Sequence, residues 1–87
     1  MKTIKKKTWP EDFGKIISGE KKIEFRLADF DIQDGDILLL EEYDPKIKQY
    51  TGRKIEKKVD KVFHFNLDDF GQKKELEERG FYVIQLD

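Results

Sequence analysis

The chain has 87 residues, a length that suits one domain covering residues 1–87. Its 18 basic and 19 acidic residues nearly cancel, which argues against a protein that coats DNA by bulk electrostatics. The absence of cysteine excludes a disulfide framework, a thiol nucleophile and a thiolate metal site. No stretch is apolar enough for a membrane span or a signal-peptide core, so the expected location is cytoplasmic.

Charge is high and unevenly distributed, yet the chain is expected to fold. Charged residues make up 43% of the sequence and hydrophobic residues 37%, but seven Phe, three Tyr and one Trp supply large groups to bury. Lysines crowd residues 2–7, and basic residues recur over residues 53–61. The second basic stretch is interpreted as a solvated strand face, with an extended RNA path as the alternative.

The first elements are a short extended segment and a helix. Residues 1–7 predict a strand, and Thr8 with Glu11 forms a capping-box pattern that predicts a helix over residues 9–18. Gly19 suits the left-handed position that ends a helix. One apolar stripe should face the core, made of Trp9, Phe13, Ile16 and Ile17.

Residues 22–27 alternate polar and apolar side chains, as a half-buried strand does. A loop with an Asp34-Gly35 turn leads to an apolar run that predicts a buried strand over residues 37–43. Residues 41–57 are interpreted as a long β-hairpin, and its second strand is expected to cover residues 53–65.

The C-terminal part begins with a loop at residues 66–71. A charged surface helix is predicted over residues 72–79, and a final strand over residues 81–86. This order favours a mainly β protein with one or two helices (α+β). The expected architecture is a small β-barrel or strongly curved sheet, closed at one end by the N-terminal helix.

Segment 19–29 carries the main candidate site. On a strand, Glu24 and Arg26 share one face, with Lys21 close by. Arginine offers a planar fork for a phosphate or a base edge, lysine a point charge, and glutamate an acceptor for amines. The alternative is a structural ion pair between Glu24 and Arg26.

Aromatic residues could add stacking surfaces. Trp9 is interpreted as a core residue on the helix stripe, with a base-stacking role as the alternative. Tyr43 and Tyr50 flank the predicted hairpin turn, and their positions fit stacking on a ligand and packing within the hairpin equally well. Arg53 is expected at the same hairpin tip. His64 is the only histidine, so no zinc site is expected, and the aspartates of residues 29–36 lack the spacing of a calcium loop. No cofactor is expected.

Taken together, these motifs resemble a bacterial and phage family of the DUF3850 type, placed among the ASCH domains. The resemblance rests on Thr8-Trp9-Pro10-Glu11, Gly19-x-Lys21, Glu24-x-Arg26, Asp29, Gly35-Asp36, Glu42-Tyr43-Asp44 and Tyr50-Thr51-Gly52-Arg53. It implies a PUA-like pseudo-barrel whose G-x-K-x-x-E-x-R segment lines a cleft beside the helix. Asp29 matches a residue of the family's motif. The Asn that usually follows the arginine in that motif is missing here, as is the histidine often found before Trp-Pro.

The function expected from this resemblance is binding of RNA or a modified nucleotide in that cleft. Some small ASCH proteins look like amidohydrolases that deacetylate N4-acetylcytidine with a lysine and a threonine of the same motif. Lys21 stands at the lysine position, but Glu24 occupies the threonine position and cannot serve in the same way as an oxygen nucleophile. Binding is therefore favoured over catalysis. A protein-docking module that uses the hairpin edge is a third hypothesis, and the oligomeric state is left open.

Overall fold

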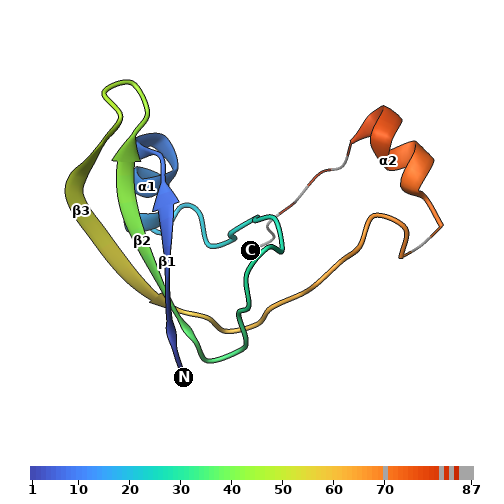
Figure 1. Cartoon of the computed structure of the whole chain (residues 1–87), viewed down its shortest axis with the longest axis horizontal. Helices are drawn as coiled ribbons and strands as arrows, with labels where there is room; N and C mark the ends of the chain where they lie inside the picture. The colour runs from blue at the N-terminus through green and yellow to red at the C-terminus, as the bar shows by residue number, and fades with distance from the viewer. Residues whose placement is uncertain (70, 81, 83, 85–87) are drawn as a thin grey trace.

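The computed structural model describes residues 1–69, 71–80, 82 and 84. Within them the protein is a small α+β structure with a three-stranded mixed sheet and two helices (Figure 1). The elements are β1 (Thr3–Thr8), α1 (Pro10–Ile17), β2 (Ile37–Asp44), β3 (Gln49–Lys58) and α2 (Lys73–Arg79). No helix among these residues has the length and apolar character needed to cross a membrane.

The sheet has the order β1-β2-β3, with β1 parallel to β2 and β2 antiparallel to β3. A parallel pair needs a crossover connection, which here contains α1 and the irregular residues 18–36. Both outer strands keep a free edge among the described residues, so the sheet is open and these strands do not close the pseudo-barrel that the sequence led us to expect. The predicted final strand, residues 81–86, lies largely outside the described residues.

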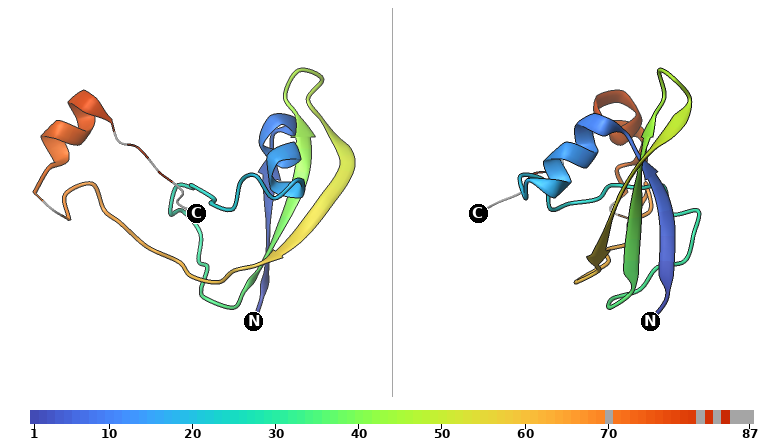
Figure 2. Two further views of the ribbon diagram at one scale, coloured as in Figure 1. Left: turned by 180° about the vertical axis from the view of Figure 1, so that it is seen from behind. Right: turned by 90° about the vertical axis from the view of Figure 1, so that its left-hand side faces the viewer.

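Helix α1 covers one face of the sheet, as the turned view in Figure 2 shows. Ile16 packs with Leu38 and Leu40 of β2, and all three are buried because the apolar run of β2 faces the helix here. Phe13 is completely buried one turn earlier. The remaining part of this cluster consists of partly buried side chains: Ile4, Ile32, Ile55 and Val59.

The helix begins one residue later than its sequence suggested. Trp9, not Thr8, is the N-cap, with extended angles φ −69° and ψ 153° and no side-chain capping bond. The capping-box prediction is therefore wrong: Thr8 ends β1 instead. The end of the helix is confirmed, since Gly19 has φ 80° and its N–H donates to the carbonyl of Ile16 at 3.2 Å.

The hairpin prediction is confirmed, but its second strand is shifted. Strand β3 starts four residues earlier and ends seven residues earlier than expected. Its last residue, Lys58, pairs with Ile37 at the beginning of β2, so beyond it β2 offers no further partner. The predicted helix over residues 72–79 is confirmed as α2, which lies away from the sheet in Figure 1. The radius of gyration is 14.8 Å, above the roughly 12 Å expected for a compact domain of this length.

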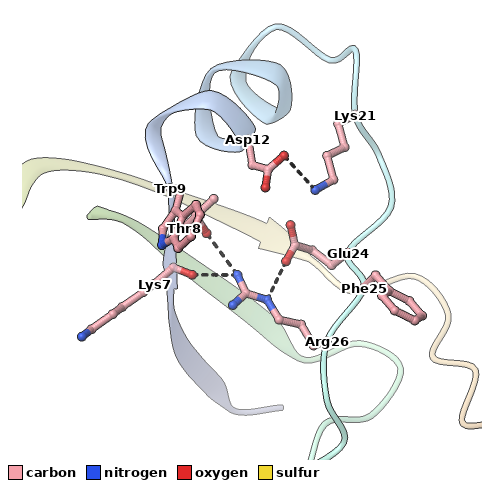
Figure 3. Close-up of a pocket in the computed structure, with 8 residues that line it drawn as sticks. All are labelled: Lys7, Thr8, Trp9, Asp12, Lys21, Glu24, Phe25 and Arg26. Carbon is pink, nitrogen blue, oxygen red and sulfur yellow. Dashed lines mark hydrogen bonds and ion pairs between the residues drawn. The ribbon is translucent and has the colours of Figure 1, made fainter. Parts of the chain in front are cut away.

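Residues 22–27 do not form the strand that their alternation predicted. Their apolar row is not buried either, because Phe25 is 66% exposed and Leu27 80% exposed. The segment runs irregularly past the end of β1 and the start of α1 (Figure 3). This placement brings its polar side chains, Glu24 and Arg26, against those two elements.

Candidate functional site

A pocket of about 210 Å³ lies between residues 21–26 and the junction of β1 with α1. The junction contributes Lys7, Thr8, Trp9 and Asp12, and the facing segment contributes Lys21, Glu24, Phe25 and Arg26 (Figure 3). The volume is below the usual range of about 300–1,000 Å³ for pockets that hold drug-sized ligands. It suits a group smaller than those ligands.

Arg26 connects the two walls of the pocket. Its Nη2 donates to the main-chain carbonyl of Lys7 at 2.8 Å and to Oγ1 of Thr8 at 3.2 Å. Its Nε donates to Oε2 of Glu24 at 2.8 Å on the other side. The ion-pair interpretation of Glu24 and Arg26 is thus correct in geometry, but the pair also forms a wall of the pocket.

Lys21 closes the pocket at the helix side. Its ammonium lies 3.3 Å from Oδ1 of Asp12, on the first turn of α1. Its main-chain N–H donates to the carbonyl of Lys15 at 3.0 Å, which extends the C-terminal hydrogen bonding of the helix. Because both the backbone and the side chain of Lys21 are bonded to α1, the ammonium has a defined position beside the pocket.

Trp9 is exposed at the rim of the pocket, so its interpretation as a core residue is wrong. The side chain is 63% exposed, whereas Phe13 on the same sequence stripe is completely buried. The stripe assumed helical geometry from Trp9 onward, but the residue has extended angles and precedes the first helical turn. An exposed indole beside a polar pocket can stack on a planar ligand.

The residues that line the pocket include three cations, two carboxylates and two aromatic rings. Oε1 of Glu24 and Nη1 of Arg26 make no hydrogen bond to any described residue, so one acceptor and one donor group stay available to a ligand. A ligand with a flat ring and both donors and acceptors on its edge matches this set. A doubly charged anion fits less well, since Asp12 and Glu24 would repel it.

Four predicted site residues lie outside the pocket. Asp29 is 4.0 Å from the ammonium of Lys6 in an exposed ion pair. Tyr43 and Tyr50 pack edge to face in the hairpin, with ring centroids 5.1 Å apart. Arg53 is not at the tip, where residues 45–48 form the turn, but within β3.

Arg53 belongs to a separate network around the buried Glu42, on the helix side of the sheet. Its Nε and Nη2 donate to Glu42 at 2.9 and 2.6 Å, and Oγ1 of Thr51 donates to Glu42 at 2.6 Å. The hydrogen bonds from Arg53 and then Thr51 lower the pKa of the Glu42 carboxyl, and the same pairing raises the pKa of Arg53. The guanidinium also lies over the ring of Phe13, 5.1 Å from its centroid. This network stabilises the packing of α1 on the sheet.

Asp12, Lys7 and Thr8 were not expected in the pocket. A signal for Asp12 exists in the sequence: it follows Trp9 by three residues, the spacing of neighbours on a helix surface. Thr8 is 4% exposed because Arg26 covers its hydroxyl. No group of three or more histidine, cysteine or acidic side chains among the described residues could hold a metal ion.

The comparisons with known proteins give one match. The family model described as "Domain of unknown function (DUF3850)" matches residues 3–77. No curated protein and no solved structure matches the chain. Residues 3–77 include the whole pocket, both strands of the hairpin and most of α2. Because this match spans far more than half of its length, the chain belongs to the DUF3850 family.

Proposed function

We propose that this chain binds RNA or a modified nucleotide by holding one nucleobase in the pocket beside Trp9. The observation that carries the proposal is the exposed indole at the rim of a pocket that also presents charged donors and acceptors. A nucleobase has a flat π face for stacking and a polar edge for hydrogen bonds.

The groups in the pocket match the edge of a base. Glu24 can accept from an exocyclic amine through Oε1, and Arg26 can donate from Nη1 to a ring nitrogen or carbonyl. Lys21, placed by Asp12, adds a donor on the helix side. Modified bases suit the site because an added polar group can reach one of these charges.

The proposal includes the wider relationship to ASCH domains and their PUA-like fold. Its support is that the segment Gly19-x-Lys21-x-x-Glu24-x-Arg26 lines a pocket beside the first helix. This is the position that the resemblance implies for the ligand cleft of those domains.

Titration with the four ribonucleoside monophosphates and with N4-acetylcytidine tests the proposal. Trp9 is the only tryptophan, so stacking should quench the intrinsic fluorescence of the protein. Trp9→Ala should abolish binding, as measured by calorimetry. The matched control Phe63→Ala removes another exposed aromatic ring, 76% exposed and outside the pocket, and should leave binding unchanged. If none of the five compounds binds at millimolar concentration, the proposal is wrong.

Hydrolysis of an acylated nucleoside is the weaker proposal. The ammonium of Lys21 is already paired with Asp12, and Glu24 already accepts a hydrogen bond from Arg26. The one hydroxyl in the pocket, that of Thr8, is buried and accepts a hydrogen bond from Arg26, and among the described residues it makes no hydrogen bond to a carboxylate that could take its proton. Incubation with N4-acetylcytidine, with Lys21→Ala as control, should therefore show no turnover above the control.

A further inference from the structure

A cluster of one lysine and two tyrosines, Lys7, Tyr43 and Tyr50, lies beside the pocket, and Lys7 is also one of the residues that line it. The ammonium of Lys7 is 4.3 Å from the ring centroid of Tyr43 and 5.7 Å from that of Tyr50. The two rings meet edge to face, 71° apart. Tyr50 is 52% exposed, so much of it faces solvent. The cluster combines a cation with aromatic rings, as single-stranded nucleic acid binders do.

The alternation of side chains along β1 and β2 indicates which face of the sheet this cluster occupies, and how Trp9 lies relative to it. Side chains of β1 and β2 that face α1 include Ile4 and Leu40, so Lys7 and Tyr43 project from the opposite face. Thr8 turns back toward the buried side and Trp9 is extended, so Trp9 follows Lys7 onto the solvent side. Figure 3 shows the side chain of Lys7 pointing away from Arg26 and Glu24. Lys7 thus shares the sheet face of Tyr43 and precedes the exposed Trp9 in the chain, and its ammonium lies near the exposed ring of Tyr50.

The ammonium of Lys7 has no carboxylate partner among the described residues. Other lysines do form such ion pairs: Lys2, Lys6, Lys15, Lys21 and Lys61. The nearest opposing charge in the strand register is Glu41, directly across from Lys7 on β2 and also across from Lys54 on β3, without an ion pair to either. A phosphate could therefore reach Lys7 without displacing an existing ion pair.

We infer that the ligand is a single-stranded nucleic acid chain rather than a free nucleotide. One base occupies the pocket beside Trp9, the next phosphate contacts Lys7, and a neighbouring base stacks on Tyr50. The assignment is supported by a cation that lies near one exposed ring, Tyr50, and is separated from another, Trp9, by a single residue, since aromatic rings and cations match the alternation of base and phosphate. The inference rests on the proposed function, because the pocket supplies the first base.

Binding should therefore grow with oligonucleotide length. The test uses homo-oligomers of uridine, cytidine and adenosine with one, two, four and eight nucleotides, and the matching deoxy series. Affinity should rise on going from one to four nucleotides, and the series with the higher affinity identifies RNA or DNA as the source. The measurement is fluorescence anisotropy with the longer oligomers and quenching of Trp9 with the mononucleotides.

Substitutions distinguish the contribution of the cluster of Lys7, Tyr43 and Tyr50 to binding from that of the pocket. Tyr50→Leu keeps an apolar group in the hairpin but removes the π face, and should weaken octamer binding roughly 5- to 150-fold without affecting the mononucleotide. Tyr50→Phe should bind like the parent protein. Lys7→Met should lower the slope of log affinity against log salt by about 0.7, the value for one phosphate contact to a single strand. The control Lys57→Met removes a lysine at the far end of β3 and should bind with nearly unchanged affinity.

Two results would overturn the inference, and they differ in what they say about the pocket. If mononucleotides bind but octamers bind no better, and Tyr50→Leu has no effect, the chain ligand is wrong while the pocket stands. If neither mononucleotides nor octamers bind, the proposed function fails together with the inference. A length dependence that Trp9→Ala removes and Tyr50→Leu reduces supports both.

Discussion

Arg26 donates a hydrogen bond from Nη2 to the main-chain carbonyl of Lys7 at 2.8 Å, and this bond joins an irregular segment to the first strand. The same nitrogen reaches Thr8, and Nε holds Glu24. Residues 22–27 form no strand, and the side chain of Arg26 attaches this irregular segment to β1. The guanidinium of Arg26 therefore helps to hold one wall of the pocket in place.

Replacing Arg26 should affect both stability and binding. Arg26→Ala removes three hydrogen bonds made by a partly buried cation, and should lower the free energy of unfolding by about 1–2 kcal/mol. Arg26→Lys keeps the charge but cannot span Glu24 and the Lys7 carbonyl in the same planar fork, so it should recover little of either property. Urea unfolding and nucleotide titration measure the two effects. Arg79→Ala, an exposed change on α2, is the control, and a fully active Arg26→Ala protein would show that the wall is held by other contacts.

Trp9 should behave as a surface residue until a ligand covers it. Because its side chain is 63% exposed, Trp9→Phe should change the free energy of unfolding by about 0.5 kcal/mol or less. The emission of the parent protein should be that of a hydrated indole and should be quenched readily by acrylamide. Adding a bound nucleotide should protect the ring from this quencher. An emission spectrum typical of a buried indole would contradict the exposed position.

Much of this fold could be predicted because its signals are local. The apolar run of β2, the Gly19 helix end and the charged helix before Gly80 each depend on a few neighbouring residues. The hairpin could be predicted for the same reason, with Asp44-Pro45 opening its turn. The proximity of Lys21, Glu24 and Arg26 could also be predicted, because these residues are close together in the sequence.

The remaining features depend on contacts that spacing alone does not contain. Trp9 fits the helix stripe by position, but one extended residue at the N-cap moved it to the surface. The alternation of residues 22–27 is typical of a strand, yet this segment is not one of the three strands of the described sheet, because strand formation depends on pairing as well as on alternation. The end of β3 is set by where β2 begins, at Ile37.

Acid should destabilise the protein through Glu42. Hydrogen bonds from Arg53 and Thr51 lower its pKa below the ordinary value of 4.5, so the unfolded chain binds more protons than the native protein in that range. This stabilisation is present above about pH 4.5 and is lost as the pH falls through the lowered native pKa. Asp36 adds to the same trend, because hydrogen bonds from the N–H groups of Gln33 and Lys2 lower its pKa from the ordinary 3.8.

Glu42→Gln separates this contribution from the general effect of acid. The variant should be less stable than the parent protein at about pH 7, and the difference should shrink as the pH falls below about 4.5. Urea unfolding at several pH values measures the free energy of unfolding of both proteins as a function of pH. An equal difference at all pH values would mean that Glu42 titrates alike in the folded and unfolded chains.

Replacement by alanine should change the stability of the protein in opposite directions at two glycines. Gly14 lies exposed in the middle of α1, where an added Cβ would meet no atom within 4 Å, so Gly14→Ala should stabilise the protein by about 0.5–1 kcal/mol. Gly35 has a φ of 87° in the turn before β2, where its N–H donates to the carbonyl of Val59 at 2.8 Å. Alanine there is strained in the left-handed region, so Gly35→Ala should cost about 1–2 kcal/mol even though the space around it is open. In thermal unfolding, the two variants should shift the melting temperature in opposite directions, by about 4–8 °C for each kcal/mol. A stabilising Gly35→Ala would mean that the turn adopts an ordinary right-handed or extended conformation.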